Sequence, residues 1–240
     1  MEREFYKNLK QQLIILSALA LLISCNKEVA KLNDCVMPGE VTQVEAQAEA
    51  EDQNSESDNA PTVCVLPEQE LDANLTINFE LTNFPVEREK KMRESIERLM
   101  LVVNSKGFKQ RVLDHEYKGE KTFVDNNGLT NEQIYEQIME GAETLSPEVD
   151  EEIDLNITLY YKNNSTVGYT YPNRDRIWVN DKFFATNRYG KVAANLLHEW
   201  THKIGFGHDR SRTASRPYSV PYGVGTIIKE LIDEMTPSEQ

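Results

Sequence analysis

The sequence predicts a mixed α/β (α+β) fold, in which helices are layered on a sheet. Three observations predict this class. Apolar and polar residues alternate in several stretches, as they do in half-buried strands. Between these stretches, apolar residues recur every three or four positions, as they do on one face of a helix. Both patterns interleave from residue 71 onward, so we expect one folded domain over residues 71–240 of this 240-residue chain.

The first half of this region predicts one strand and three helices. Residues 75–81 alternate as a strand does. After Pro85, an apolar stripe at spacings of three and four predicts a helix, and its members are Met92, Ile96, Leu99, Met100 and Val103. A shorter helix is expected after Gly107. Thr130 opens the pattern of a capping box, which predicts a third helix that ends at Gly141.

The second half predicts three strands and two helices. Residues 153–161 alternate strictly and predict a strand. Residues 167–171 and 177–180 are two further strands across a turn, and the proline after residue 171 places the first of them at a sheet edge. A helix is expected over residues 188–204. A last helix is expected over residues 226–235.

A run of chemically active residues ends the helix before the last one. His198 and His202 are four positions apart, so a helix places both on one face, where two imidazoles can bind one zinc ion. Glu199 points beside that ion, where it can take a proton from a water and pass it to a leaving amine. Gly205 permits the sharp turn that ends the helix, and the turn brings back His208 as a third ligand. Three protein ligands leave an open position for the water.

The pattern accounts for three of the four histidines of the chain. For a chain of this composition, a chance match is expected on the order of 10⁻⁵ times. The fourth histidine, His115, stands in a polar stretch and is expected to be an ordinary exposed residue. Leu196 and Trp200 lie at helical spacing on the side away from the histidines, and we expect them to pack in the core rather than to contact a substrate.

The whole run resembles the long zinc-binding consensus of the metzincin metallopeptidases, His-Glu-x-x-His-x-x-Gly-x-x-His. All five fixed positions of that consensus match. The resemblance implies three roles, which are Zn²⁺ ligand, general base and acid, and turn residue. The Zn²⁺ ligands would be His198, His202 and His208. Glu199 would be the general base and acid, and Gly205 the turn residue.

The resemblance also implies an architecture. It is a metzincin-like mixed twisted sheet with an edge strand over the active-site helix, antiparallel to a bound peptide, and a small C-terminal subdomain with a terminal helix. Residues 167–171 stand in the place of the edge strand. Metzincins carry a methionine in a tight turn after the third histidine, and the segment most similar to that turn, residues 218–223, has Pro221 instead. Tyr218 and Tyr222 are candidates for a catalytic hydrogen-bond donor or an extra ligand, and the alternative is that both only pack.

The chain begins with the pattern of an export signal, residues 1–24. A basic, polar head precedes an apolar run of 11 residues, and a bilayer core needs about 20. The run ends in Leu-Ile-Ser-Cys, which resembles a bacterial lipobox and implies that Cys25 carries a lipid anchor. Asn26 favours the outer membrane or cell surface of the bacterial envelope over the inner membrane. The alternatives are an ordinary signal peptide with an incidental cysteine and an uncleaved transmembrane helix.

Residues 25–70 are expected to be a lipidated, acidic and disordered tether. Between Glu40 and Ala60 there are seven acids and no Lys or Arg, and a segment so poor in apolar groups does not offset the entropy lost on ordering. An exposed helix is the alternative, because Ala, Glu and Gln favour helices. Cys35 and Cys64 are a candidate disulfide in an oxidising compartment, and the alternative is two free thiols.

The formal charge of -14 argues against nucleic acid as a partner, because phosphate recognition needs clustered Lys and Arg. The sequence therefore predicts an exported, lipid-anchored, zinc-dependent endopeptidase. Its expected cofactor is Zn²⁺, its expected partners are a protein or peptide substrate and a membrane, and its expected state is a monomer. Two alternatives remain open: a catalytically inactive, metallopeptidase-like surface binding lipoprotein, and a zinc amidase that acts on cell-wall peptides.

Overall fold

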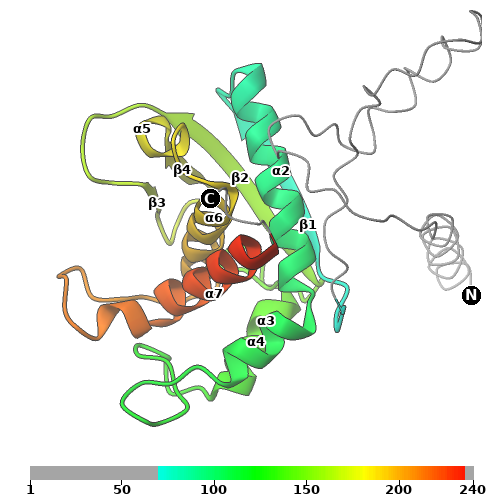
Figure 1. Cartoon of the computed structure of the whole chain (residues 1–240), viewed down its shortest axis with the longest axis vertical. Coiled ribbons are helices and arrows are strands. Elements are labelled where there is room, and N and C mark those ends of the chain that lie inside the picture. Colours follow the sequence, from blue (N-terminus) through cyan, green and yellow to red (C-terminus); the bar gives the residue numbers. More distant parts are fainter. Residues whose placement is uncertain (1–69, 236–240) are drawn as a thin grey trace, which may run out of the picture. The chain divides into compact units, whose positions relative to one another are not determined.

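Six α-helices and a four-stranded sheet make up residues 70–235, the part of the chain that this computed structural model describes (Figure 1). Their order is β1 (Thr76–Thr82), α2 (Val86–Val103), α3 (Lys106–Leu113), α4 (Asn131–Glu140), β2 (Glu152–Tyr160), β3 (Gly168–Thr170), β4 (Ile177–Asn180), α5 (Asp181–Phe184), α6 (Tyr189–Lys203), the 3₁₀ helix η4 (Arg216–Tyr218) and α7 (Val220–Met235). The fold is mixed α/β, as predicted. The predictions for the export signal, the lipidated Cys25, the tether, and Cys35 with Cys64 lie outside the described residues.

The sheet has the strand order β1-β2-β4-β3. β1 pairs in parallel with β2, so that Phe79 lies opposite Leu155, and β2 pairs in parallel with β4. β3 pairs antiparallel with β4 and forms one edge of the sheet, which confirms the predicted edge strand. Within residues 70–235, no strand pairs with the other side of β3, so β3 is an edge to which a further strand could be added.

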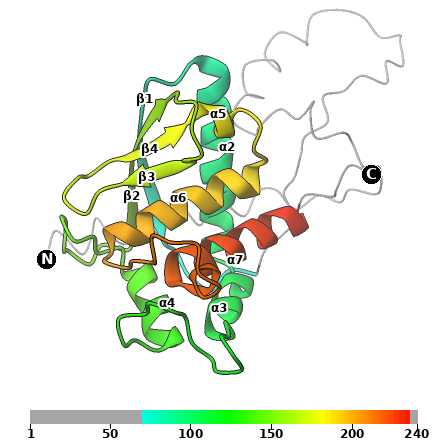
Figure 2. The ribbon, with the colours of Figure 1, turned by 90° about the vertical axis from the view of Figure 1, so that its left-hand side faces the viewer.

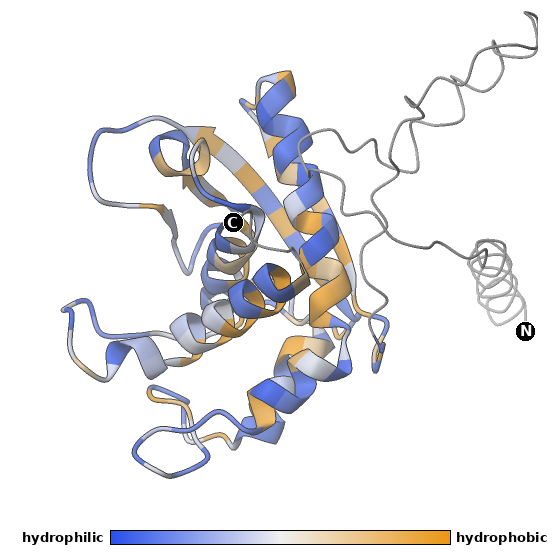
Figure 3. Ribbon diagram, viewed as in Figure 1, coloured by the Kyte–Doolittle hydropathy of each residue, from blue (hydrophilic) through white to orange (hydrophobic). Residues whose placement is uncertain are grey.

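The strands turn one side toward the core. Along β2, the buried apolar side chains are Ile153, Leu155, Ile157 and Leu159, and most residues between them are partly exposed. This alternation is visible along the β2 ribbon (Figure 3). Helix α2 packs against β1, and α6 packs against β2, β3 and β4. Helix α6 lies between the sheet and α7 (Figure 2), so both sides of α6 have packing partners.

Helices α2, α3, α4 and α6 confirm the sequence predictions. Helix α4 has the predicted capping box, in which the Thr130 hydroxyl accepts a hydrogen bond from the backbone of Gln133. It ends at Gly141, whose φ of 73° is in the left-handed region. The short helix α5 has no counterpart in the prediction. None of the helices between residues 70 and 235 is long and apolar enough to cross a membrane.

The predicted turn at residues 218–223 is wrong. The chain forms η4 and then enters α7 at Val220, well before the predicted start at residue 226. Pro221 is compatible with this start, because the first turn of a helix leaves its N–H groups without intrahelical partners. Pro, Tyr and Gly in succession are typical of a turn, but here the three residues begin a helix.

Close packing explains the two glycines inside α7. A Cβ at Gly223 would lie 2.7 Å from the Phe123 ring, and a Cβ at Gly225 would lie 3.0 Å from the carbonyl oxygen of Ala194 on α6. The prediction that His115 is exposed is wrong. His115 is half-buried, and its ring stacks on that of Phe123 with centroids 3.9 Å apart. The absent side chains therefore let α7 approach α6 and the Phe123 ring.

Helix α7 belongs to the main core. Its buried apolar residues join one cluster with those of the sheet and of α2, and they include Val224, Ile228, Leu231 and Ile232. The predicted terminal helix is therefore present. It is not part of a separate small subdomain, because its buried apolar residues belong to the same core cluster as those of α6 and the sheet.

Candidate metal centre

Helix α6 and the turn after it bring three imidazoles together. His198 and His202 lie on one face of α6, with ring centroids 5.0 Å apart. Gly205 follows the helix with φ 98°, a backbone conformation that residues with a side chain rarely adopt. No atom lies within 4 Å of the position that a Cβ would take at this residue. Glycine is therefore required here for its backbone and not for space. The turn brings the His208 ring back toward the helix, with its centroid 4.9 Å from that of His202 and 5.2 Å from that of His198.

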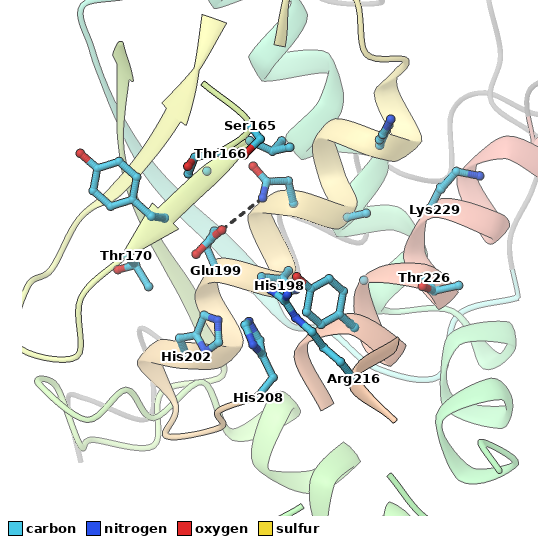
Figure 4. A pocket seen from close by; sticks show the side chains of 18 of the residues that line it. Ser165, Thr166, Thr170, His198, Glu199, His202, His208, Arg216, Thr226 and Lys229 are labelled. Carbon is cyan, nitrogen blue, oxygen red and sulfur yellow. Dashed lines mark hydrogen bonds between the residues drawn. The ribbon is translucent and has the colours of Figure 1, made fainter. Parts of the chain in front are cut away.

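The three rings point toward one another in the cleft (Figure 4). Each offers one ring nitrogen, and these nitrogens lie within 4.8 Å of one another. Among the described residues, no fourth His, Cys, Asp or Glu joins this group. Three imidazole nitrogens are a donor set that zinc takes in proteins, and catalytic zinc sites add a water or substrate to three such ligands.

Backbone carbonyls hold two of the rings by their other nitrogens. Nδ1 of His202 lies 2.7 Å from the carbonyl oxygen of Phe206, and Nδ1 of His208 lies 2.9 Å from that of Asp209. A carbonyl oxygen can only accept, so Nδ1 must carry the hydrogen in each ring. In each neutral imidazole the lone pair is then on Nε2, as a metal ligand requires.

A backbone group also holds His198. It hydrogen-bonds to the backbone of Pro221, which has no N–H, so the imidazole is again the donor. Burial, together with the neighbouring His202 and His208, lowers the pKa of His198 to about 3. Burial also lowers the pKa of His202. Neutral imidazoles with fixed tautomers are prepared to bind a metal ion without first losing a proton.

Glu199 lies beside the three rings and is 5% exposed. Its Oε1 accepts a hydrogen bond from Nδ2 of Asn195 at 3.3 Å, and the backbone of Thr170 on β3 donates another. Burial raises the pKa of Glu199 to about 7, and these two hydrogen bonds oppose the rise. A carboxyl group with a pKa near 7 can both accept and release a proton at neutral pH.

The edge strand β3 approaches α6 closely. A Cβ at Gly168 would lie 2.5 Å from Oδ1 of Asn195, so only glycine lets the strand come this near. Sequence reasoning missed Asn195 and Gly168 as parts of the site. Asn195 is four residues before Glu199, on the same face of the helix, and that spacing was the available signal. For Gly168 the sequence holds no such signal, because its neighbour is distant in the chain.

The opposite wall of the site contains one of the two candidate tyrosines. The Tyr222 ring lies 4.5 Å from that of His198 and 4.8 Å from that of His208, between centroids. Tyr218 is 41% exposed, and its ring packs against Tyr117 at 5.1 Å. Tyr218 is not among the residues that line the cleft. The structure therefore brings Tyr222, but not Tyr218, to the three histidines.

The histidines and Glu199 lie in one cleft of about 730 Å³, between β3 on one side and α7 on the other. Several basic side chains line this cleft, and sequence reasoning missed all of them as parts of the site. They are Lys191, Arg210, Arg212, Arg216 and Lys229. They come from α6, from the loop after His208, from η4 and from α7, so no local pattern connects them.

The other side of α6 is packed as predicted. Leu196 and Trp200 are both 0% exposed. The indole Nε1 of Trp200 donates to Oε1 of Glu143 at 2.6 Å, and the backbone N–H of Asp154 donates to the same oxygen at 3.1 Å. Burial raises the pKa of Glu143, and the bonds from Trp200 and Asp154 oppose the rise. A buried polar anchor thus fixes the core side of the helix.

We compared the chain with known protein families, curated proteins and solved structures. No family model matches the chain, and no curated protein and no solved structure matches it. Any function must therefore be inferred from the residues in and around the cleft.

Proposed function

We propose that this protein is a zinc-dependent endopeptidase of the metzincin type. One observation carries the proposal: three imidazole nitrogens within 4.8 Å of one another lie beside a buried glutamate, Glu199, in an open cleft. The free side of the edge strand β3 borders the same cleft, as the metzincin resemblance implies. The donor set, the acid–base group and the peptide-sized cleft together match peptide-bond hydrolysis.

In this proposal, His198, His202 and His208 hold the zinc ion. Zinc, when bound, would supply a Lewis acid that polarises the scissile carbonyl and lowers the pKa of a water toward 7. Glu199 takes a proton from the attacking water while the water oxygen forms a bond to the carbonyl carbon. Glu199 then gives that proton to the leaving nitrogen as the C–N bond breaks. Its pKa of about 7 suits both transfers.

The substrate would lie extended along β3. The unpaired side of this strand can hydrogen-bond a peptide as an additional strand. We expect antiparallel pairing, which is the more stable arrangement per residue. Tyr222, on the opposite wall, is the candidate donor to the oxyanion that develops on the scissile carbonyl.

The proposal includes export and anchoring. The apolar run before Leu-Ile-Ser-Cys supports cleavage of a signal peptide after residue 24 and lipidation of Cys25. The acidic stretch between Glu40 and Ala60 would then separate the anchor from the peptidase domain. This arrangement places the cleft outside the cytoplasm, on the bacterial cell envelope.

The test is peptide cleavage by the purified, zinc-loaded protein, with and without a chelator, for the wild type and for Glu199→Gln. We expect the wild type to cleave peptides from a mixed library and the chelator to stop cleavage. Glu199→Gln should lower kcat by about 10²- to 10⁴-fold, because it removes the proton acceptor. Its zinc content, measured by mass spectrometry, should not change, because Glu199 is not among the three imidazole ligands. Glu136→Gln, the same change at an exposed site on α4, is the matched control.

Two outcomes would contradict the proposal. If the zinc-loaded wild type hydrolyses no substrate at all, the chain is a binding lipoprotein. If it cleaves cell-wall peptides but no protein or other peptide, it is an amidase. If Glu199→Gln cleaves at the wild-type rate, Glu199 is not the general base.

A further inference from the structure

The cleft has a charge opposite to that of the chain. The formal charge of the chain is -14, with 40 acidic and 26 basic residues. Five basic side chains line the cleft, and the only carboxylate among its lining residues is that of Glu199. The basic residues are Lys191, Arg210, Arg212, Arg216 and Lys229. A basic cleft on an acidic protein attracts negatively charged ligands into it.

Few of these cations are neutralised by the protein itself. Lys229 forms a salt bridge with Asp233 at 2.7 Å. Arg216 donates to a backbone carbonyl and lies over the Tyr222 ring at 4.8 Å. Within the described part of the chain, Lys191 has no ion-pair partner. Arg210 and Arg212 also lack one there, so most of the positive charge remains available to a ligand.

Contacts along the cleft fix the direction of β3. Gly168 lies against Asn195, and the Thr170 backbone bonds Glu199 four residues later on α6. Strand β3 therefore runs in the same direction as α6, and its C-terminal end is beside the reacting groups. Its N-terminal end points toward the start of α6, where Lys191 lies one helical turn before Asn195.

The opposite wall brings a second lysine to the same end of the cleft. Gly225 of α7 lies against Ala194, whereas the backbone of Lys229 lies against Gly190 at the start of α6. Helix α7 thus runs opposite to α6. Lys191 and Lys229 therefore flank the cleft together, on the side away from Gly205, and Lys229 is seen beyond Thr226 in Figure 4.

We propose that this end of the cleft selects peptides with an acidic residue, Asp or Glu, at about the third position after the scissile bond. Lys191 lies seven residues before His198 on α6, which is about 10 Å along the helix, and an extended peptide advances about 3.3 Å per residue. This inference rests on the proposed endopeptidase function. A peptide antiparallel to β3 runs from the histidines toward the start of α6. The residues that follow the scissile bond therefore pass between Lys191 and Lys229. A carboxylate side chain there is attracted by Lys191, and less strongly by Lys229, whose charge Asp233 partly neutralises, and a lysine side chain is repelled.

The experiment uses peptides that differ only at the third residue after the scissile bond, which is Asp, Asn or Lys. A second set carries the same three residues before the bond. With the zinc-loaded protein, we expect kcat/KM for Asp after the bond to exceed that for Lys by about tenfold at low salt. The preference should shrink as NaCl rises from about 0.05 M to about 1 M, because salt screens exposed charges.

A double variant tests the two lysines. Lys191→Glu with Lys229→Glu should reverse the order, so that the Lys peptide is cleaved faster than the Asp peptide. The comparison is a ratio within one protein, so a partial loss of folded protein does not change it. Lys90→Glu, the same charge reversal at an exposed site on α2, should leave the order as in the wild type.

The outcomes separate this inference from the proposed function. Equal rates for Asp and Lys, or an acidic preference only before the bond, would overturn the inference while the endopeptidase function stands. If no peptide is cleaved, binding of the same peptides to Glu199→Gln is measured by fluorescence anisotropy. Tighter binding of the Asp peptide would then support a cleft for acidic peptides and refute the endopeptidase. Equal binding would refute both.

Discussion

The two sides of α6 have the same helical geometry but different chemistry. On the core side, Leu196 and Trp200 are 0% exposed and surrounded by apolar neighbours. On the cleft side, His198, Glu199 and His202 border open space. Most polar groups on the cleft side are held by backbone carbonyls or amides, whereas the core side is held by packing and one buried bond to an acid. The difference teaches that a rigid reactive surface needs a well-packed opposite surface.

The two sides should respond differently to mutation. A change on the core side should alter the free energy of unfolding, because it removes buried contacts. A change on the cleft side should alter the reaction, because its groups contribute little packing. Three predictions, from the largest expected effect to the smallest, test this distinction.

Trp200→Ala should have the largest effect. It removes a fully buried indole and leaves Glu143 without the donor at 2.6 Å, so we expect the free energy of unfolding to fall by about 3–5 kcal/mol. Urea unfolding followed by circular dichroism measures it. Lys191→Ala, at an exposed position of the same helix, should change it by less than about 0.5 kcal/mol. A loss below about 1 kcal/mol for Trp200→Ala would show that the core side is not the anchor of α6.

Tyr222→Phe tests the cleft side. It removes only a hydroxyl, for which the structure shows no protein partner within residues 70–235. We therefore expect the free energy of unfolding to stay within about 0.5 kcal/mol of the wild type. If the hydroxyl donates to the developing oxyanion, kcat should fall by about tenfold, with KM little changed. Tyr218→Phe, outside the cleft, is the control. An unchanged kcat for Tyr222→Phe would mean that this ring only packs.

Glu143→Gln should have the smallest effect, and that effect should depend on pH. Burial raises the pKa of Glu143 above its usual 4.5, so the folded state binds this proton more tightly than the unfolded state. Its stabilising contribution is complete below 4.5 and is lost as pH rises through the folded pKa. Glutamine keeps a carbonyl acceptor for Trp200 and has no charge. The Tm of the variant should therefore rise relative to the wild type above pH 4.5, by at most about 4 °C. A difference that stays constant from pH 4 to pH 8 would contradict this account.

Local patterns predicted most of the fold. Alternation placed β1 and β2, strand-like residues on either side of a turn placed β3 and β4, and the capping box at Thr130 placed the start of α4. The start of α7 was the clear failure. Its Pro, Tyr and Gly are turn formers in isolation, but the contacts of Gly223 with Phe123 and of Gly225 with Ala194 favour a helix. The exposure of His115 failed for the same reason, since its stacking partner Phe123 comes from another segment.

The sequence by itself determined the three imidazoles, the acid between them and the turn that joins them. All of these lie within residues 198–208, where helical periodicity and the backbone freedom of Gly205 fix the geometry locally. Tertiary structure alone decided the surroundings. It placed Asn195 against Gly168, chose Tyr222 over Tyr218, and brought basic residues from four segments into one cleft. The physical reason is that these contacts join residues far apart in the chain, and only packing of the whole core brings such residues together.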